Sequence, residues 1–214
     1  MGAKTWMLVL ADSNARKALA AKPSLDHAAT QKLGDTLFPG EKLEPIGESD
    51  LSRTCPPGNE VHMGCFQGVS IIAAKEFCTE YPSKLDPRFI AVGGNGVVTL
   101  HAMHSVVGWF AYAIWANGKL VRSLSLSPDS GVLEDIGERL PFEEPYWAGK
   151  HPVVDEGEDK DSYPFSFHPL ELGEAALKDQ FGYTIEGYIN DLELAESTPL
   201  IRYKRSQSRW WKIW

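Results

Sequence analysis

Residues 97–127, VVTLHAMHSVVGWFAYAIWANGKLVRSLSLS, decide the predicted fold of this chain. Within them Asn117-Gly118 separates two strand-like runs, and this dipeptide is typical of a type I′ hairpin turn. A two-residue turn fixes the register of the two strands, so that Ala111 is expected opposite Leu124. The stretch therefore predicts consecutive antiparallel strands over residues 97–103, 106–116 and 119–127.

The predicted register gives this hairpin two different faces. One face is apolar and belongs to the core. The other face pairs Tyr112 with Ser123 and Phe110 with Ser125, which makes a mixed apolar and hydroxyl surface. We expect that surface to be half exposed or to line a groove, where it would bind a ligand. Trp147 is a further candidate for an aromatic binding pocket, although aromatic side chains are more often core residues.

The rest of the chain alternates strand-like and helical segments. Residues 131–149 favour a helical turn followed by a loop. Because strands outnumber helices and tight turns join neighbouring strands, the sequence predicts the α+β class, with a mainly antiparallel sheet and helices packed on it. The other predicted segments are strands over 4–12, 42–46, 60–66, 69–75 and, at a sheet edge, 199–204, together with helices up to Ala21 and over 25–37, 87–92 and 169–181.

Length and composition are ordinary for a compact protein, with 214 residues, 43% apolar side chains, 23% charged side chains and a net charge of −8. An acidic chain lacks the basic face that duplex nucleic acid requires, so duplex binding is not expected. The longest apolar run, Val106–Ala116, has 11 residues, fewer than the ~20 that cross a bilayer. The apolar stretch after Lys4 is too short for a secretory signal, which predicts a cytoplasmic protein.

We divide the chain into a main α+β domain over 1–152, an acidic linker or loop over 153–162, and a C-terminal helix with a tail over 163–214 that packs on the same domain. The tail carries basic and aromatic side chains. It either binds an anionic surface, such as a membrane, or covers the domain's own apolar surface. The residues that would make this contact are Arg209, Trp210, Trp211, Lys212 and Trp214.

A second candidate site follows from the bend at His104. In the predicted register this bend lies at the same end of the meander as the turn after Ser127, which brings His104 close to hydroxyls and carboxylates. A small hydrolase or transferase would use His104 as the base, a serine as the nucleophile and an aspartate to orient the base. The serines are Ser127 and Ser130, and the aspartates are Asp129 and Asp135. The alternative is a plain turn over residues 128–131, whose polar side chains bond the backbone.

Metal and cofactor sites are not predicted. His101 and His104 point to opposite faces of one strand, so they do not share a metal ion. Cys55, Cys65 and Cys78 are an odd number without CxxC spacing. That pattern argues against both a zinc ribbon and a disulfide framework.

Four separate words of the sequence carry a family resemblance: MGAKTWML, LHAMHSVVGWFAYAIW, VRSLSLSPDSGVLEDIGERLPFEEPYWAG and FHPLELGEAAL. Together they resemble an uncharacterised family of actinobacterial proteins over roughly residues 1–181, with the tail after about residue 190 outside the resemblance. The resemblance implies a bacterial cytosolic protein and supplies no activity. The preferred interpretation is a non-catalytic binding or regulatory domain for a protein or a small ligand. The hydrolase or transferase and the membrane-binding tail are the alternatives.

Overall fold

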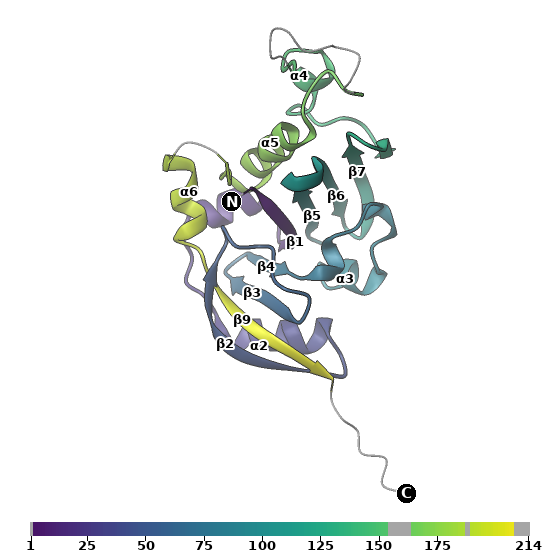
Figure 1. Ribbon diagram of the computed structural model, residues 1–214. Coiled ribbons are helices and arrows are strands. Elements are labelled where there is room, and N and C mark those ends of the chain that lie inside the picture. Colours follow the sequence, from purple (N-terminus) through teal and green to yellow (C-terminus); the bar gives the residue numbers. More distant parts are fainter. Residues whose placement is uncertain (1, 154–163, 187–188, 208–214) are drawn as a thin grey trace, which may run out of the picture.

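A computed structural model describes residues 2–153, 164–186 and 189–207 of the chain (Figure 1). In this part of the chain nine strands form one sheet, in the order β2-β9-β3-β4-β1-β5-β6-β7-β8. Every neighbouring pair is antiparallel, which confirms the α+β class with an antiparallel sheet. The strands are β1 (Lys4–Ala11), β2 (Glu41–Asp50), β3 (Glu60–Phe66), β4 (Val69–Ala73), β5 (Val97–His104), β6 (Trp109–Ala116), β7 (Lys119–Ser127), β8 (Gly131–Ile136) and β9 (Pro199–Gln207).

The helices begin and end at residues that capping rules favour. Asp26 caps α2, because the Asp26 carboxylate accepts a hydrogen bond from the Ala29 backbone N–H at 2.9 Å. The clearest predicted helix, α5, begins at Pro169 and ends at Gly182, whose φ is 90°. The helices are α1 (Ala15–Ala20), α2 (His27–Leu37), α3 (Pro87–Ala91), α4 (Glu144–Trp147), α5 (Pro169–Phe181) and α6 (Ile189–Glu196), and the 3₁₀ turns are η1 (Lys75–Phe77), η2 (Pro82–Lys84) and η3 (Ser105–Val107).

Buried side chains gather into two cores. The first core joins Phe110 of β6 to Leu172 of α5. Gly173 allows α5 to lie close to the sheet, since a Cβ at this position would stand 3.0 Å from the Phe110 ring. The second core joins Leu37 of α2 to Leu100 of β5. Side chains alternate along a strand, so the odd-numbered residues of β5 face the first core. The even-numbered residues face the second core, and the last of them is His104.

Three predicted elements differ from the structure. The strand expected at a sheet edge, β9, lies inside the sheet between β2 and β3, and among the described strands β2 pairs with β9 alone (Figure 1). Residues 131–136 form β8 and not a helical turn, because they continue the meander by pairing with β7. The strand expected from residue 106 begins at Trp109, after the turn η3.

The predicted Asn117-Gly118 turn is confirmed, with φ values of 51° and 72°. The predicted register of β6 and β7 beyond this turn is wrong. Ile114 lies opposite Arg122, so Val121 is an extra residue that forms a β-bulge in β7. From this point every partner differs by one residue from the prediction: Ala111 lies opposite Ser125, and Tyr112 lies opposite Leu124.

The bulge changes which side chains share a face. A shift of one residue moves each following side chain to the other side of the sheet. Tyr112 and Phe110 face the first core. Ser123 and Ser125 stand opposite Ala113 and Ala111, which face the second core. The predicted mixed surface of Phe110, Tyr112, Ser123 and Ser125 therefore does not form, and all four residues are buried.

Two sequence predictions fall on residues that are not described. The acidic segment over 153–162 lies, apart from Val153, outside the described part of the chain, as do the tail residues Arg209, Trp210, Trp211, Lys212 and Trp214. Among the residues that the structure does describe, no helix has the length and apolar character needed to cross a membrane.

Candidate functional site

The predicted His104 site does not assemble as expected. His104 ends β5 and lies opposite Trp109 of β6. Because β6 stands between β5 and β7, about 10 Å, or two strand spacings, separates the backbones of His104 and Ser127. In the part of the chain that the structure describes, no hydrogen bond joins His104 to a serine or a carboxylate, and its buried Nδ1 atom has no partner there.

The other residues of that predicted site have structural roles. Ser127 is only 8% exposed, and its carbonyl accepts a hydrogen bond from the Ser130 N–H at 3.3 Å. Asp129 is exposed between them, so the alternative interpretation of a plain turn describes this segment. Asp135 lies in β8 and accepts a hydrogen bond from Arg122.

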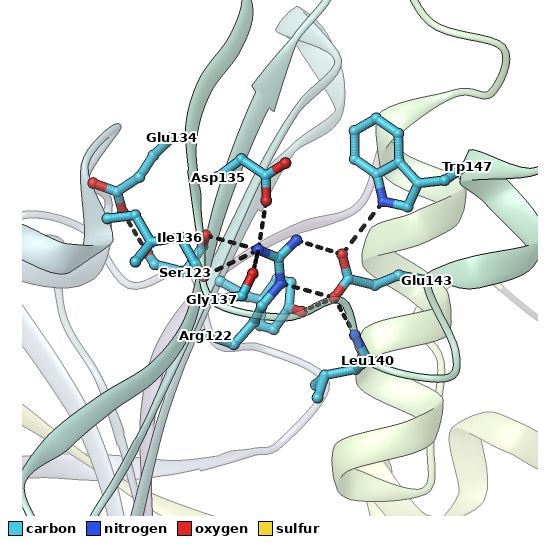
Figure 2. A network of polar contacts seen from close by, with 10 residues as sticks. Arg122, Ser123, Glu134, Asp135, Ile136, Gly137, Leu140, Glu143 and Trp147 are labelled. Carbon is cyan, nitrogen blue, oxygen red and sulfur yellow. Dashed lines mark hydrogen bonds and ion pairs between the residues drawn. The ribbon is translucent and has the colours of Figure 1, made fainter.

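Arg122 is the centre of a buried polar network (Figure 2). Its side chain has no exposed surface, and it donates from Nε to Glu143 Oε1 at 2.9 Å and from Nη2 to Glu143 Oε2 at 2.7 Å. The third guanidinium nitrogen, Nη1, donates to Asp135 and to the carbonyls of Ile136 and Gly137. The network therefore ties the chain after β8 to the sheet.

The Glu143 carboxylate also accepts several hydrogen bonds besides those from Arg122. Its carboxylate accepts hydrogen bonds from the Tyr112 hydroxyl at 2.5 Å, the Leu140 backbone N–H at 2.8 Å and the Trp147 indole at 3.4 Å. Burial opposes ionisation of Glu143, but the hydrogen bonds from Arg122, Leu140 and Tyr112 hold its pKa below the ordinary value. Burial and the Glu143 charge raise the pKa of Tyr112, which stays neutral. The Arg122 and Glu143 side chains are fully buried and hydrogen-bonded to each other and to their neighbours, so this pair has a structural role.

The predicted binding residues are occupied in the same way. The Ser123 hydroxyl donates to Glu134, which also accepts from the Ser83 backbone N–H at 3.0 Å. Ser125 accepts a hydrogen bond from the Trp109 indole at 3.1 Å. These contacts fix β7 against β6 and η2. Serine hydroxyls that the sequence suggested for ligand binding thus serve the packing of the sheet.

A different site lies beside His104. It is a cleft with a volume of about 600 Å³, which we call the Trp6–His104 cleft. The rings of Trp6 and His104 are nearly parallel, with an interplanar angle of 13° and centroids 6.2 Å apart, and they form one aromatic wall. The residues that line the cleft are Trp6, Cys55, Pro56, Pro57, Gly58, Lys75, Cys78 and His104.

Backbone contacts of Trp6 place the loops that form the cleft. The Trp6 N–H donates to the Thr54 carbonyl at 2.9 Å, and the Trp6 carbonyl accepts from the Ala74 N–H at 3.3 Å. A hydrogen bond of 2.9 Å between the hydroxyls of Thr54 and Thr5 strengthens the first contact. Both segments are therefore held against β1 at Trp6. The residues that follow Thr54 and Ala74, among them Cys55, Lys75 and Cys78, line the cleft.

The polar groups of the cleft are neutral except for lysine. Burial and the nearby Lys4 charge hold the pKa of His104 below its ordinary value, so the imidazole is neutral at pH 7. Burial raises the pKa of the Cys55 and Cys78 thiols, so neither is a ready thiolate nucleophile. Trp6 Nε1 and His104 Nδ1 are both buried and have no hydrogen-bond partner.

Residues 5–203 match the sequence profile of a family described as a family of unknown function (DUF6928). The chain belongs to this family. The match confirms the expected uncharacterised family and extends past residue 181 to include most of β9, so the expected limit of the resemblance was too early. No curated protein and no solved structure matches the chain.

All eight residues that line the cleft lie within the DUF6928 match. Within the described ranges, no group of three or more histidine, cysteine and acidic side chains is arranged to hold a metal ion. Sequence reasoning selected His104 but missed the rest of the cleft. Trp6, Cys55 and Cys78 come from distant parts of the chain and share no motif spacing, and only the sheet order brings them together.

Proposed function

We propose that this member of DUF6928 is a non-catalytic binding domain whose small-molecule ligand occupies the Trp6–His104 cleft. A volume of about 600 Å³ lies within the roughly 300–1,000 Å³ that small-molecule sites occupy. An aromatic wall faced by prolines suits a flat ring compound, which such a wall binds by stacking. The three free cysteines fit a protein that acts in the reducing cytoplasm.

The observation that carries this proposal is the pair of unpartnered ring nitrogens. Both rings line the cleft, and Trp6 Nε1 and His104 Nδ1 are buried within these rings without a hydrogen-bond partner among the described residues. A buried polar atom without a partner costs about 1–3 kcal/mol, and native proteins rarely keep one without a reason. A ligand that enters the cleft and adjusts this wall would supply the missing hydrogen bonds.

Binding is favoured over nucleophilic catalysis by the state of the reactive groups. His104 has no hydrogen bond to a serine or a carboxylate that would make it a general base. The two thiols carry raised pKa values, and no described base is hydrogen-bonded to either of them. The cleft therefore offers shape, apolar area and hydrogen-bonding atoms.

The test is an NMR titration of the full chain with a set of one- and two-ring compounds. Each charged compound in the set is paired with a neutral compound of equal size. Trp6→Phe assigns the Trp6 indole N–H resonance, which we expect to shift in a saturable way with compounds that bind. Trp147→Phe assigns an indole outside the cleft as the control. The proposal is contradicted if no compound moves the Trp6 resonance, or if the Trp147 resonance moves equally.

A further inference from the structure

We infer that the ligand of the Trp6–His104 cleft is an organic anion, a flat ring that carries an acidic group held by Lys4 and Lys75. This inference rests on the proposed function and adds the chemical class of the ligand. The acidic group is a carboxylate or a phosphate, since both are bound by lysine ammonium groups in the same way. The ring would lie on the Trp6 and His104 wall.

Lys75 is placed directly on the cleft. Its stem crosses over Gly58, since a Cβ added at Gly58 would lie 3.2 Å from Lys75 Cδ and 4.0 Å from Nζ. Both residues line the cleft, and the Lys75 side chain forms no ion pair with any carboxylate in the described part of the chain. An ammonium group at the edge of an apolar cleft is thus available to an anion.

Lys4 brings a second positive charge close to the aromatic wall, beside His104. It lies opposite His104 at the start of β1. Its charge acts on both Cys55 and His104, where it favours the thiolate and the neutral imidazole. Like Lys75, it has no ion-pair partner among the described carboxylates. Two cations without an ion-pair partner among the described carboxylates thus lie at the cleft, Lys75 in its lining and Lys4 beside His104.

The nearby carboxylates do not cancel these charges. Glu41 and Glu76, in a neighbouring cleft of about 310 Å³, are both held by Arg205, with nitrogen–oxygen distances of 2.7 and 2.6 Å. Glu80 is exposed, and its charge contributes to the raised pKa of Cys78. In a chain with a net charge of −8, a cleft bordered by unpaired cations is a local reversal of charge, which favours an anionic ligand.

The experiment compares 2-naphthoate with 2-naphthylmethanol, a neutral probe of the same shape, by calorimetric titration of the full chain. Ion pairs to a desolvated carboxylate predict that 2-naphthoate binds about 10-fold tighter. Lys75→Met and Lys4→Met keep an unbranched apolar stem and remove the charge. Each should weaken binding of 2-naphthoate several-fold more than binding of 2-naphthylmethanol. Lys119→Met, at the hairpin turn on the opposite end of β6, is the matched control and should change neither affinity.

The outcomes separate the inference from the proposed function. If both probes bind to the native chain with equal affinity, the inference of an anionic ligand is wrong, and the proposed function as a binding domain is unaffected. If the lysine variants weaken both probes equally, the lysines act through their stems and the inference is also overturned. If neither these nor any other ring compounds bind, the proposed function itself fails. Unchanged indole N–H resonances in each variant establish that it is folded.

Discussion

Arg122 of β7 and Glu143, the residue before α4, form a two-pronged ion pair in which neither side chain has any exposed surface (Figure 2). The pair connects β7 of the sheet to the segment between β8 and α4. Its Tyr112 and Leu140 contacts leave the carboxylate fully hydrogen-bonded. A buried charge pair of this kind adds little net stability, but either charge alone is costly in the core.

Removing one charge of this pair should therefore destabilise the fold strongly. We expect Glu143→Gln to lower the free energy of unfolding by about 3–5 kcal/mol, because Arg122 loses its buried counter-charge. Urea denaturation at pH 7 measures the change. Asp135→Asn is the control, since the Asp135 side chain is 34% exposed and should cost about 1 kcal/mol or less. A loss below about 1 kcal/mol for Glu143→Gln would mean that the pair is not buried as described.

Protonation of His101 should destabilise the protein in mild acid. His101 is 1% exposed, its Nε2 donates to the Gly173 carbonyl at 3.0 Å, and its Nδ1 has no partner. Burial lowers its pKa to about 4, against about 6.5 in the unfolded chain. Its contribution is therefore complete above pH 6.5 and is lost progressively as the pH falls towards 4, at roughly 1.4 kcal/mol per pH unit.

The comparison that isolates this effect is His101→Gln, which keeps an amide donor for Gly173 and does not titrate. Urea denaturation between pH 7 and pH 4.5 should show a steeper loss of stability in the native chain than in the variant. Parallel pH profiles would show that His101 is protonated in the folded state and would contradict the prediction.

The three thiols should react with iodoacetamide in an order set by exposure. Cys78 is exposed, Cys55 is half-buried and Cys65 is buried, so we expect modification in that order. Burial raises all three pKa values, and the rates should still be rising above pH 9. Peptide mass spectrometry gives the rate at each site.

A compound bound in the Trp6–His104 cleft should slow the reaction of Cys55 and Cys78 only. Cys65 lies outside the cleft and serves as the internal reference. Protection of Cys65 to the same degree would indicate that the compound stabilises the whole fold and does not cover the two cleft thiols.

The proposed membrane contact of the tail can be tested without disturbing the sheet. A chain that ends at Gln207 keeps all of β9 and lacks Arg209, Lys212 and the three final tryptophans. If the tail binds anionic lipid, the full chain should sediment with phosphatidylserine vesicles at low salt, and the shortened chain should not. Equal binding to neutral phosphatidylcholine vesicles, or no binding by the full chain, would contradict this role.

Local signals in the sequence predicted the elements well. Asn117-Gly118 fixes its own turn because both residues tolerate positive φ, and Pro169 with Gly182 marks both ends of α5. The bulge at Val121 has no such signal. It places Arg122 on the face where Glu143, 21 residues later, supplies the counter-charge, so the register depends on a contact that hydrophobic alternation does not show.

The candidate site depended still more on distant contacts. The expected partners of His104 lie on β7, on β8 and in the turn between these strands, and β6 with Trp109 stands between them and β5. The actual neighbours of His104 are brought to it by β1 and by the loops after Thr54 and Ala74. Sequence spacing alone cannot reveal such a site, because the pairing of β1 with β5 and the backbone contacts of Trp6 join residues that are far apart in the chain.

The interior position of β9 has a consequence for synthesis of the protein. Among the described strands β2 pairs only with β9, so a nascent chain that has not yet emerged beyond residue 199 holds a ten-residue ribbon without a hydrogen-bonding neighbour and an open edge on β3. Such edges recruit other chains. Residues 199–207 must therefore be synthesised before this half of the sheet can close, and a stop codon upstream of β9 would cost the protein two strands instead of one.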